Sequence, residues 1–474
     1  MDTVKQNGTA LEEKKVSKPP RGKLDMTNGP FIKKLILFAV PLILTGLLQS
    51  FYNAADLAVV GRFDGEIALA AVGSTGALTN LILGLFMGLS VGAGVMVAHQ
   101  MGAMRYRAVE RVVHNAVLIA AILGLVVGMI GFVGAPYFLR MMDTPDTVIK
   151  DATLYLRIIF CGVPASMLYN YCASMLRSTG DTKRPLIYLA ISGLVNVALN
   201  LILVCFFSMG VAGVAIGTIA SQYLSAAMIL VYMHRTDGVM HFSFRKLGLR
   251  KNIMKQMLNI GIPSGIQGVL FSLSNVMIQS SINRFGDVVM AGNSAAANLE
   301  GFVYVAMNAM YQATLTFVGQ NVGAKQYKNI KKVLFGSLLW VTVIGVASGC
   351  FILLFDDFFT GLYITDGAAK EAATTRLFLI LPVYFMCGIM EVLGGALRGM
   401  GKSMTTMINS LIGACALRIV WCNLIFVIFE EPKITHIYFS YPVSWLLVIL
   451  LHIVFFVISY RKLAHPKNIE DRLS

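Results

Sequence analysis

Residues 40–63, VPLILTGLLQSFYNAADLAVVGRF, return about 221 residues later as IPSGIQGVLFSLSNVMIQSSINRF at 262–285. The two stretches align Pro41 with Pro263 and end on the same Arg-Phe pair. Two further pairs keep nearly the same offset: VAHQMGAMRY (97–106) with VGQNVGAKQY (318–327), and LRSTG (176–180) with LRGMG (397–401). A repeat of this period predicts two structural halves built to one plan.

Long apolar stretches dominate each half. The 474-residue chain is 57% hydrophobic and 13% charged, against roughly 25% charged for a soluble domain. Its mean hydropathy is +0.72. A membrane-spanning helix needs about 20 apolar residues. Twelve stretches qualify, at 31–62, 66–98, 111–135, 151–177, 185–206, 210–233, 256–284, 288–319, 333–356, 374–399, 405–429 and 437–460. We therefore expect an all-α polytopic membrane protein of twelve transmembrane helices in two six-helix lobes.

Basic residues predict the orientation of these helices. Thirty of the 39 Lys and Arg fall in the tails and in the alternate loops expected inside, and seven fall in outer loops. Six spans in each half make the two repeats parallel. We expect a cytoplasmic N-terminal tail (1–30), an amino lobe (31–233, helices 1–6), a cytoplasmic linker (234–255), a carboxy lobe (256–460, helices 7–12) and a cytoplasmic C-terminal tail (461–474).

Several classes of function are disfavoured by the sequence. The net charge of +15 is spread over the loops, so we expect no nucleic-acid partner. All seven cysteines lie in apolar runs without metal-ligand spacing, which predicts neither a disulfide framework nor a structural metal. GMGKS (399–403) lacks the first glycine of a phosphate-binding loop. No catalytic motif is evident, so we expect neither an enzyme nor a cofactor.

Three acids fall inside predicted spans: Asp56, Glu300 and Glu391. A charged side chain inside the bilayer costs free energy, so such residues usually have a functional or structural role. Asp56 shares a helical face with Thr45, Gln49, Tyr52 and Asn53, while Asn196 and Asn200 form an i,i+4 amide pair on the fifth span. A carboxylate facing two amides predicts a proton or cation site, with Na⁺ at Asp56 as the one candidate metal. A static interhelical hydrogen bond is the alternative.

The second half differs, because the repeat aligns Asp56 with Ile278. Glu300 shares a face with Tyr304, and Glu391 lies deep in the tenth span. With Gln49 and Asn53 of the first half, these residues are predicted to bind a cationic substrate or a second ion. The alternative is an ion pair with Arg418, which we expect to be the one deep cation and to have a structural role.

The first predicted span of each half contains one proline at a matching position. Pro41 and Pro263 each remove a backbone donor there, which predicts a hinge or a fixed bend.

The motifs together resemble those of the multidrug and toxic compound extrusion (MATE) transporters, nearly from end to end. The resemblance rests on P-x14-D followed by LAVVGR in the first span, LRSTGDTKRP (176–185), AANLEGFVYVAMNAMYQATLTFVGQNVGA (296–324) and LRGMGK (397–402). It implies two six-helix lobes around a cleft. It also implies export of organic cations or drugs in exchange for H⁺ or Na⁺.

The resemblance also implies roles for particular residues. Asp56 matches the coupling acid of the first helix and Pro41 the proline at which that helix bends, while Tyr155 and Asn196 match polar members of the same site. The chain departs from some relatives because Asn200 stands in place of a second acid. Phe271 and Cys387 stand where other branches carry carboxylates, so a carboxy-lobe Na⁺ site of that kind is not expected.

The sequence therefore predicts a multi-pass antiporter of the bacterial cytoplasmic membrane. We expect it to export amphipathic or cationic drugs and other small organic compounds, to work by alternating access, and to function as a monomer. One alternative is a flippase of the same superfamily that moves a lipid-linked glycan. Another is a non-transporting, receptor-like membrane protein.

Overall fold

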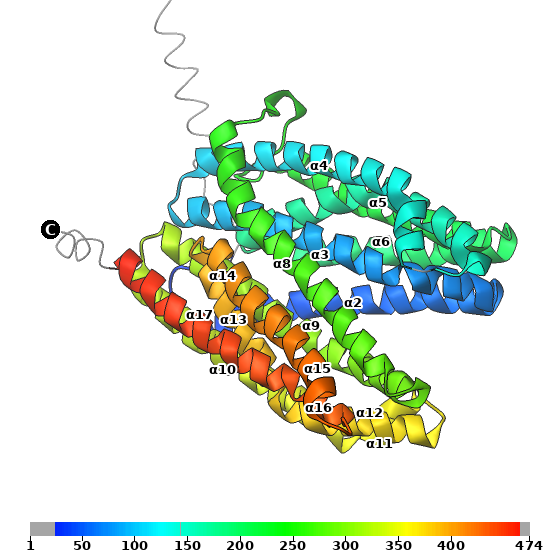
Figure 1. Cartoon of the computed structure of the whole chain (residues 1–474). Helices are drawn as coiled ribbons and strands as arrows, with labels where there is room; N and C mark the ends of the chain where they lie inside the picture. Colours follow the sequence, from blue (N-terminus) through cyan, green and yellow to red (C-terminus); the bar gives the residue numbers. More distant parts are fainter. Residues whose placement is uncertain (1–23, 143, 465–474) are drawn as a thin grey trace, which may run out of the picture. The chain divides into compact units, whose positions relative to one another are not determined.

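The structure is a computed structural model that describes residues 24–142 and 144–464, and helices joined by turns form all the regular structure in these ranges. Figure 1 shows the helices in sequence colours. The first half contains α2 (Phe31–Phe63), α3 (Glu66–Gly102), α4 (Tyr106–Met141), α5 (Asp146–Ser178), α6 (Lys183–Leu201), the π-helix η1 (Ile202–Phe206) and α7 (Gly210–Arg235).

The second half follows a linker with one 3₁₀ turn, η2 (Phe244–Lys246). Its elements are α8 (Lys251–Asn283), α9 (Asp287–Gly323), α10 (Tyr327–Leu354), α11 (Asp356–Gly361), α12 (Gly367–Ile380), the 3₁₀ turn η3 (Leu381–Val383), α13 (Phe385–Gly399), α14 (Ser403–Ser410), the π-helix η4 (Leu411–Ala416), α15 (Leu417–Ile428), α16 (Ile434–Tyr438) and α17 (Ser440–Ala464).

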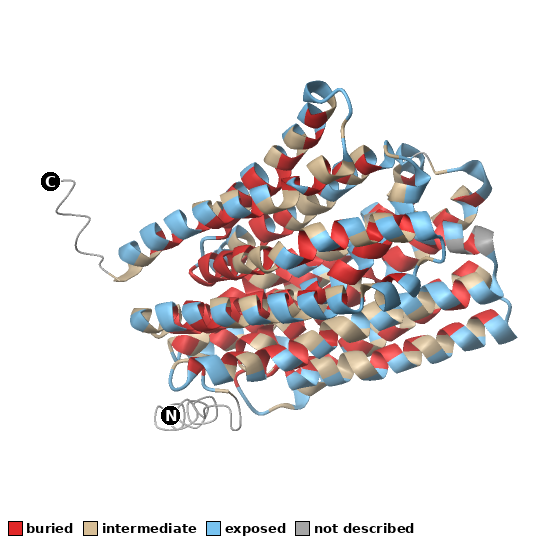
Figure 2. Ribbon diagram, turned by 90° about the horizontal axis from the view of Figure 1, so that it is seen from below, coloured by how far each residue is buried: buried red, intermediate tan, exposed pale blue. Residues whose placement is uncertain are grey.

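Ten helical segments of the described chain are long and apolar enough to cross a membrane. An eleventh is formed by Gly367–Val383 with Phe385–Gly399, which bend by 47° at their junction. The long helix α9 accounts for the remaining predicted span, at 288–319. Figure 2 shows buried and exposed residues alternating around the helices. The expected all-α fold of repeated helical halves is confirmed.

Repeated turns show the internal repeat in the backbone. Three of the first-half residues with positive φ have counterparts with positive φ 221 positions later: Gly65 (89°) pairs with Gly286 (93°), Met104 (55°) with Lys325 (57°), and Gly180 (91°) with Gly401 (78°). Left-handed backbone is uncommon outside glycine. Its recurrence at Met104 and Lys325 therefore reflects the same turn built twice.

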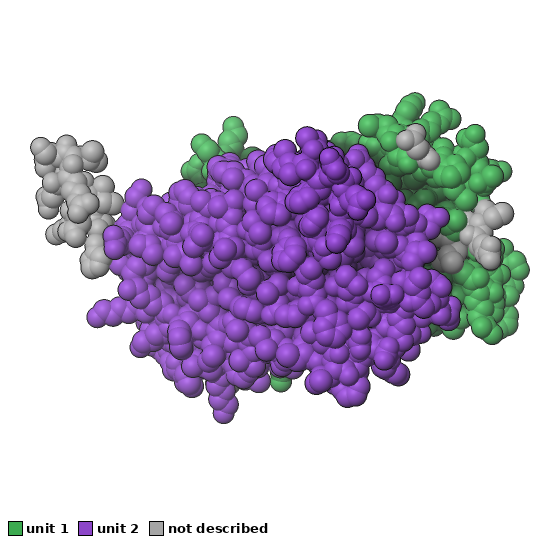
Figure 3. Space-filling view, turned by 60° about the horizontal axis from the view of Figure 1, so that its bottom comes forward, with its two compact units in different colours: residues 1–25, 44–261 green, residues 26–43, 262–474 purple. Residues whose placement is uncertain are grey.

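The described chain divides into two compact units, coloured in Figure 3. Unit 1 holds residues 24–25 and 44–261, and unit 2 holds residues 26–43 and 262–464. The boundaries fall inside helices, because α2 changes unit after Ile43 and α8 changes unit after Gly261. Pro41 and Pro263 lie within two residues of these boundaries, inside continuous helices.

Specific contacts hold the segment 26–43 in unit 2. The ring of Phe38 meets Phe317 edge to face, with centroids 5.6 Å apart. The indole of Trp340 donates to the carbonyl of Ile32 at 2.9 Å, and Asn321 donates to the carbonyl of Met26 at 2.9 Å. The start of α2 is thus part of the core that α9 and α10 build.

The segment 251–261 packs against α3 in unit 1 through two glycines. A Cβ atom on Gly92 would lie 2.2 Å from the carbonyl oxygen of Met257, and one on Gly261 would lie 2.7 Å from that of Leu89. Only glycine lets the two backbones come this close. This contact fixes where α8 crosses α3.

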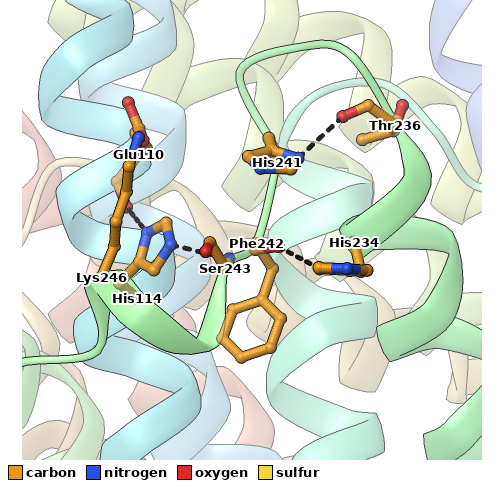
Figure 4. Close-up of polar contacts among 8 residues, drawn as sticks. All are labelled: Glu110, His114, His234, Thr236, His241, Phe242, Ser243 and Lys246. Atoms are coloured by element: carbon orange, nitrogen blue, oxygen red, sulfur yellow. Dashed lines mark hydrogen bonds and ion pairs between the residues drawn. The ribbon is translucent and has the colours of Figure 1, made fainter.

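Polar contacts tie the linker to α4 and α7 in the same unit (Figure 4). Nε2 of His114 accepts from the backbone N–H of Ser243 at 3.0 Å, and its Nδ1 lies 2.7 Å from the carbonyl of Glu110. Nζ of Lys246 lies 2.9 Å from the Glu110 carboxylate. The linker therefore packs as a part of unit 1.

Candidate ion and substrate sites

Asp56 lies half-buried on α2 and is hydrogen-bonded from two other helices of unit 1. Its Oδ1 accepts from Nδ2 of Asn200 on α6 at 2.5 Å, and its Oδ2 accepts from the hydroxyl of Thr218 on α7 at 3.3 Å. Nδ2 of Asn196 lies 3.4 Å from the same hydroxyl. The structure thus brings Asp56, Asn196 and Asn200 together, with Thr218 as a fourth member.

Two amide oxygens of this cluster have no partner. Oδ1 of Asn196 and Oδ1 of Asn200 are buried, and neither accepts a hydrogen bond from the described residues. The Asn200 oxygen faces Gly217, where a Cβ atom would lie 2.1 Å from it. Carboxylate and amide oxygens are the ligands that hard cations prefer. The described residues contain no group of three or more His, Cys, Asp and Glu side chains that could hold a metal ion.

The other predicted residues of the amino lobe lie around this cluster without joining it. Tyr155 on α5 is buried and within electrostatic range of Asp56, but it makes no hydrogen bond within the described chain. Gln49 and Asn53 are exposed on α2 and have no hydrogen bond to the cluster. Tyr52 instead donates to the carbonyl of Ala190 on α6 at 3.2 Å.

Thr218 was missed by the sequence reasoning. It lies in an apolar helix, and its one hydroxyl proton is shared between Oδ2 of Asp56 at 3.3 Å and the carbonyl of Val214 at 2.9 Å, the second being a common bond for a threonine within a helix. Nothing in its sequence neighbourhood distinguishes it from such a residue.

Glu300 is paired with Arg376 in the interior of unit 2. Nε and Nη2 of Arg376 each lie 2.7 Å from one oxygen of Glu300, and the two residues are 4% and 6% exposed. Nη1 of Arg376 donates to Oδ1 of Asn293 at 2.5 Å. The rings of Tyr438 and Tyr441 lie 5.3 Å from the guanidinium carbon. The charge of Glu300 is therefore paired with that of Arg376.

The alternative of an ion pair with Arg418 is not seen for either carboxy-lobe acid within the described residues. Glu300 pairs with Arg376, and Glu391 makes no salt bridge within the described residues. The expectation that Arg418 is the one deep cation is wrong, because Arg376 and Arg398 are 4% and 7% exposed. Both lie near the ends of predicted spans, where basic residues usually reach water.

Glu391 lies on α13 beside Tyr304 of α9. The groups that act on it electrostatically are Tyr304, Cys387 and Arg398. Arg398 points its terminal nitrogens elsewhere, because Nη1 donates to the hydroxyl of Tyr311 at 2.5 Å and Nη2 to Oε1 of Gln267 at 2.6 Å. Glu391 and Tyr304 are thus neighbours, and the carboxylate of Glu391 makes no hydrogen bond within the described chain.

A family model described as MatE matches the chain twice, at residues 41–202 and 263–424. The chain belongs to the MatE family. The resemblance inferred from sequence motifs is therefore confirmed.

Relatives of known name support the MatE assignment. The chain is 27% identical over 428 residues to the "Probable multidrug resistance protein YoeA" of Bacillus subtilis, covering 88% of this chain and 92% of that protein. It is 24% identical over 394 residues to the "Probable multidrug resistance protein NorM" of Thermotoga maritima, covering 82% and 84%. The chain thus spans nearly the whole of these MatE relatives.

Solved structures show the same fold. An outward-facing multidrug resistance MATE family transporter of the MOP superfamily matches with a TM-score of 0.87 at 19% identity, covering 94% of this chain and 99% of that one. A MOP superfamily transporter from Pyrococcus furiosus, described as having a binding pocket of reverse polarity, matches with a TM-score of 0.87 at 20% identity and the same coverage.

Proposed function

We propose that this MatE protein is a secondary active antiporter that exports amphipathic or cationic organic compounds in exchange for H⁺ or Na⁺ bound at Asp56. The observation that carries the proposal is the cluster around Asp56, in which the carboxylate meets amide and hydroxyl groups but no basic side chain of the described residues. The names of its multidrug-resistance relatives support export as the direction of transport.

The chemistry of the cluster suits reversible loading with a positive ion. Oδ1 of Asp56 accepts one hydrogen bond from Asn200, and Oδ2 shares the Thr218 proton with the carbonyl of Val214, so lone pairs remain for a proton or a cation. Binding there would favour one arrangement of unit 1, and a substrate that binds better to the other arrangement would compete with the ion. Such reciprocal linkage is sufficient for exchange.

Substrate contacts are proposed for each unit by itself: Gln49 and Asn53 in unit 1, and Tyr304 and Glu391 in unit 2. Glu391 is the acid best suited to attract a cationic compound in unit 2, because Glu300 is already paired with Arg376. The protein would act as a monomer in the bacterial cytoplasmic membrane, with both termini on the cytoplasmic side.

Everted membrane vesicles test the proposal. Uptake of a fluorescent organic cation would be driven either by an imposed pH gradient or by an imposed sodium gradient, and the effective gradient identifies the coupling ion. We expect Asp56→Asn to reduce gradient-driven uptake to that of vesicles without the protein. The amide has nearly the same shape, and its oxygen can still accept from Asn200.

Asp64→Asn is the matched control, because Asp64 is exposed just beyond α2 and undergoes the same substitution. It should transport at the wild-type rate. Full gradient-driven uptake by Asp56→Asn, at equal protein abundance in the membrane, would show that coupling does not depend on Asp56.

A further inference from the structure

Arg418 is a buried cation without an acidic partner in the described part of the chain. It lies on α15 of unit 2 and is 4% exposed. Its Nε donates to the hydroxyl of Ser444 on α17 at 2.7 Å. Its guanidinium carbon lies 4.5 Å from the ring of Tyr441 and 5.8 Å from that of Trp445. The protein thus holds the guanidinium in one orientation without neutralising its charge.

No nearby acid compensates this charge. Glu300 is occupied by Arg376, and no salt bridge joins Arg418 to any described residue. The titratable groups that act on Arg418 are the phenol of Tyr441 and three thiols, those of Cys387, Cys415 and Cys422. A buried charge in membrane surroundings is costly unless something pairs with it.

The terminal nitrogens of Arg418 are free for a ligand. Neither Nη1 nor Nη2 donates to an acceptor in the described residues, and neither is among the fully buried unpaired atoms. Arg398 of the same unit differs, since both of its terminal nitrogens have protein acceptors. A planar fork with two unused donors matches a carboxylate, sulfonate or phosphate group.

The internal repeat places Arg418 at the counterpart of the Asp56 cluster. The two family matches begin at residues 41 and 263, and at that spacing Arg418 corresponds to Asn196; at the spacing of 221 shown by the turns it corresponds to the adjacent Val197. Asp56 corresponds to Ile278, which is 1% exposed. The region that carries Asp56 and its amides in unit 1 therefore carries Ile278 and Arg418 in unit 2, a base where the first half has an acid.

The backbone before Arg418 is also unusual. The π-helix η4 (Leu411–Ala416) ends two residues before it, and π-helical turns often occur at functional sites because they shift the face on which later side chains lie. In unit 1 the π-helix η1 (Ile202–Phe206) instead follows the two asparagines. The π-helix η4 therefore affects the face of α15 on which Arg418 lies.

We propose that Arg418 is an anion-binding site of unit 2, in which Nη1 and Nη2 hold an anionic group while the rings of Tyr441 and Trp445 provide an aromatic wall beside it. The ligand chemistry is a carboxylate or sulfonate, either carried by an apolar organic compound or supplied by a small inorganic anion. This concerns binding in unit 2 and does not depend on the coupling ion or direction of transport proposed for Asp56.

Binding to the purified full-length protein in detergent tests the site. The probes are naphthalene-2-sulfonate and its neutral analogue naphthalene-2-sulfonamide, measured by titration calorimetry. We expect the wild type to bind the sulfonate at least about tenfold more tightly than the sulfonamide. Arg418→Met should abolish that preference. Arg284→Gln is the matched control, because Arg284 is an exposed arginine of the same unit that also stacks on a ring, that of Phe426, and it should keep the preference.

Competition identifies the source of the anionic group. Displacement of the sulfonate by chloride, but not by gluconate, would assign the site to small inorganic anions, and resistance to chloride would assign it to organic anions. Either result supports an anion site.

Two results would overturn the proposal. One is an equal affinity of the wild type for the two naphthalene probes, or an unchanged preference in Arg418→Met. The other is a loss of folding in Arg418→Met. Ser444 also donates to the carbonyl of Tyr441 at 2.7 Å and stays satisfied in that variant, so removing an uncompensated charge should leave the melting temperature unchanged or raise it.

Discussion

Replacing one member of the buried ion pair between Glu300 and Arg376 should lower the stability of the protein far more than replacing both members. Glu300→Gln keeps the shape of the side chain but leaves the charge of Arg376 without its carboxylate, at a position that is 4% exposed. Glu300→Leu combined with Arg376→Met removes both charges and fills most of the same volume. The comparison separates a structural ion pair from a ligand-binding carboxylate.

The contacts set the expected magnitudes. Two hydrogen bonds of 2.7 Å join the guanidinium to the carboxylate, and removing one partner of such a buried pair costs about 3–5 kcal/mol. Replacing both partners by apolar residues ranges from neutral to stabilising by about 1–4 kcal/mol. The Asn293 oxygen, which accepts from Arg376, would lose its donor at a cost of about 1–3 kcal/mol. The double variant should therefore stay near wild-type stability.

Thermal unfolding of the purified protein in detergent measures these differences. For a unit of about 200 residues, roughly 2–4 °C per kcal/mol predicts a melting temperature lowered by about 6–20 °C in Glu300→Gln. Glu371→Gln, at an exposed glutamate of α12, is the control and should be unchanged. The reasoning fails if Glu300→Gln is as stable as this control. It also fails if the stable double variant loses transport, since Glu300 would then serve a ligand.

Three further predictions follow from particular contacts. Asn200→Ala removes a donor that stabilises the ionised carboxylate of Asp56, a bond worth about 1.5–3 kcal/mol, so a proton should bind more tightly and the concentration of H⁺ at half-maximal transport should fall about ten- to hundredfold in vesicles. Gly92→Ala forces a methyl group into a backbone contact of 2.2 Å and should lower the melting temperature, whereas Gly73→Ala, in open space on the same helix, should leave it unchanged or raise it. His114→Phe removes the acceptor of the Ser243 N–H, so hydrogen exchange at that amide should accelerate severalfold, and equal exchange would contradict the contact.

Much of the fold was predictable because membrane helices leave a strong signal. Apolar runs located the spans, and the repeat from Pro41 to Pro263 showed that the halves share one plan. Hydropathy does not register backbone hydrogen-bond patterns, so η1 and η4 could not be predicted. The bend of 47° before α13 was hidden for the same reason.

The candidate sites were predictable where a polar side chain stands out from its surroundings. Asp56 and Asn200 were found together because each is conspicuous in an apolar span, and they do share a hydrogen bond. The partner of Glu300 was not found, because Arg376 lies near a span end and charges there usually reach water. Only the packing of α12 on α9 shows that this arginine is buried.

Because the boundaries between the two units fall inside α2 and α8, the chain cannot be cut between its sequence repeats without leaving part of each unit on the other fragment. A cut in the linker at residue 250 separates the two sequence repeats, yet the amino-terminal fragment would keep residues 26–43, which complete the core of unit 2. The carboxy-terminal fragment would keep residues 251–261, which complete unit 1. Neither fragment is self-sufficient, so co-expressed halves should reassemble by exchanging these segments, while either half made alone should be degraded.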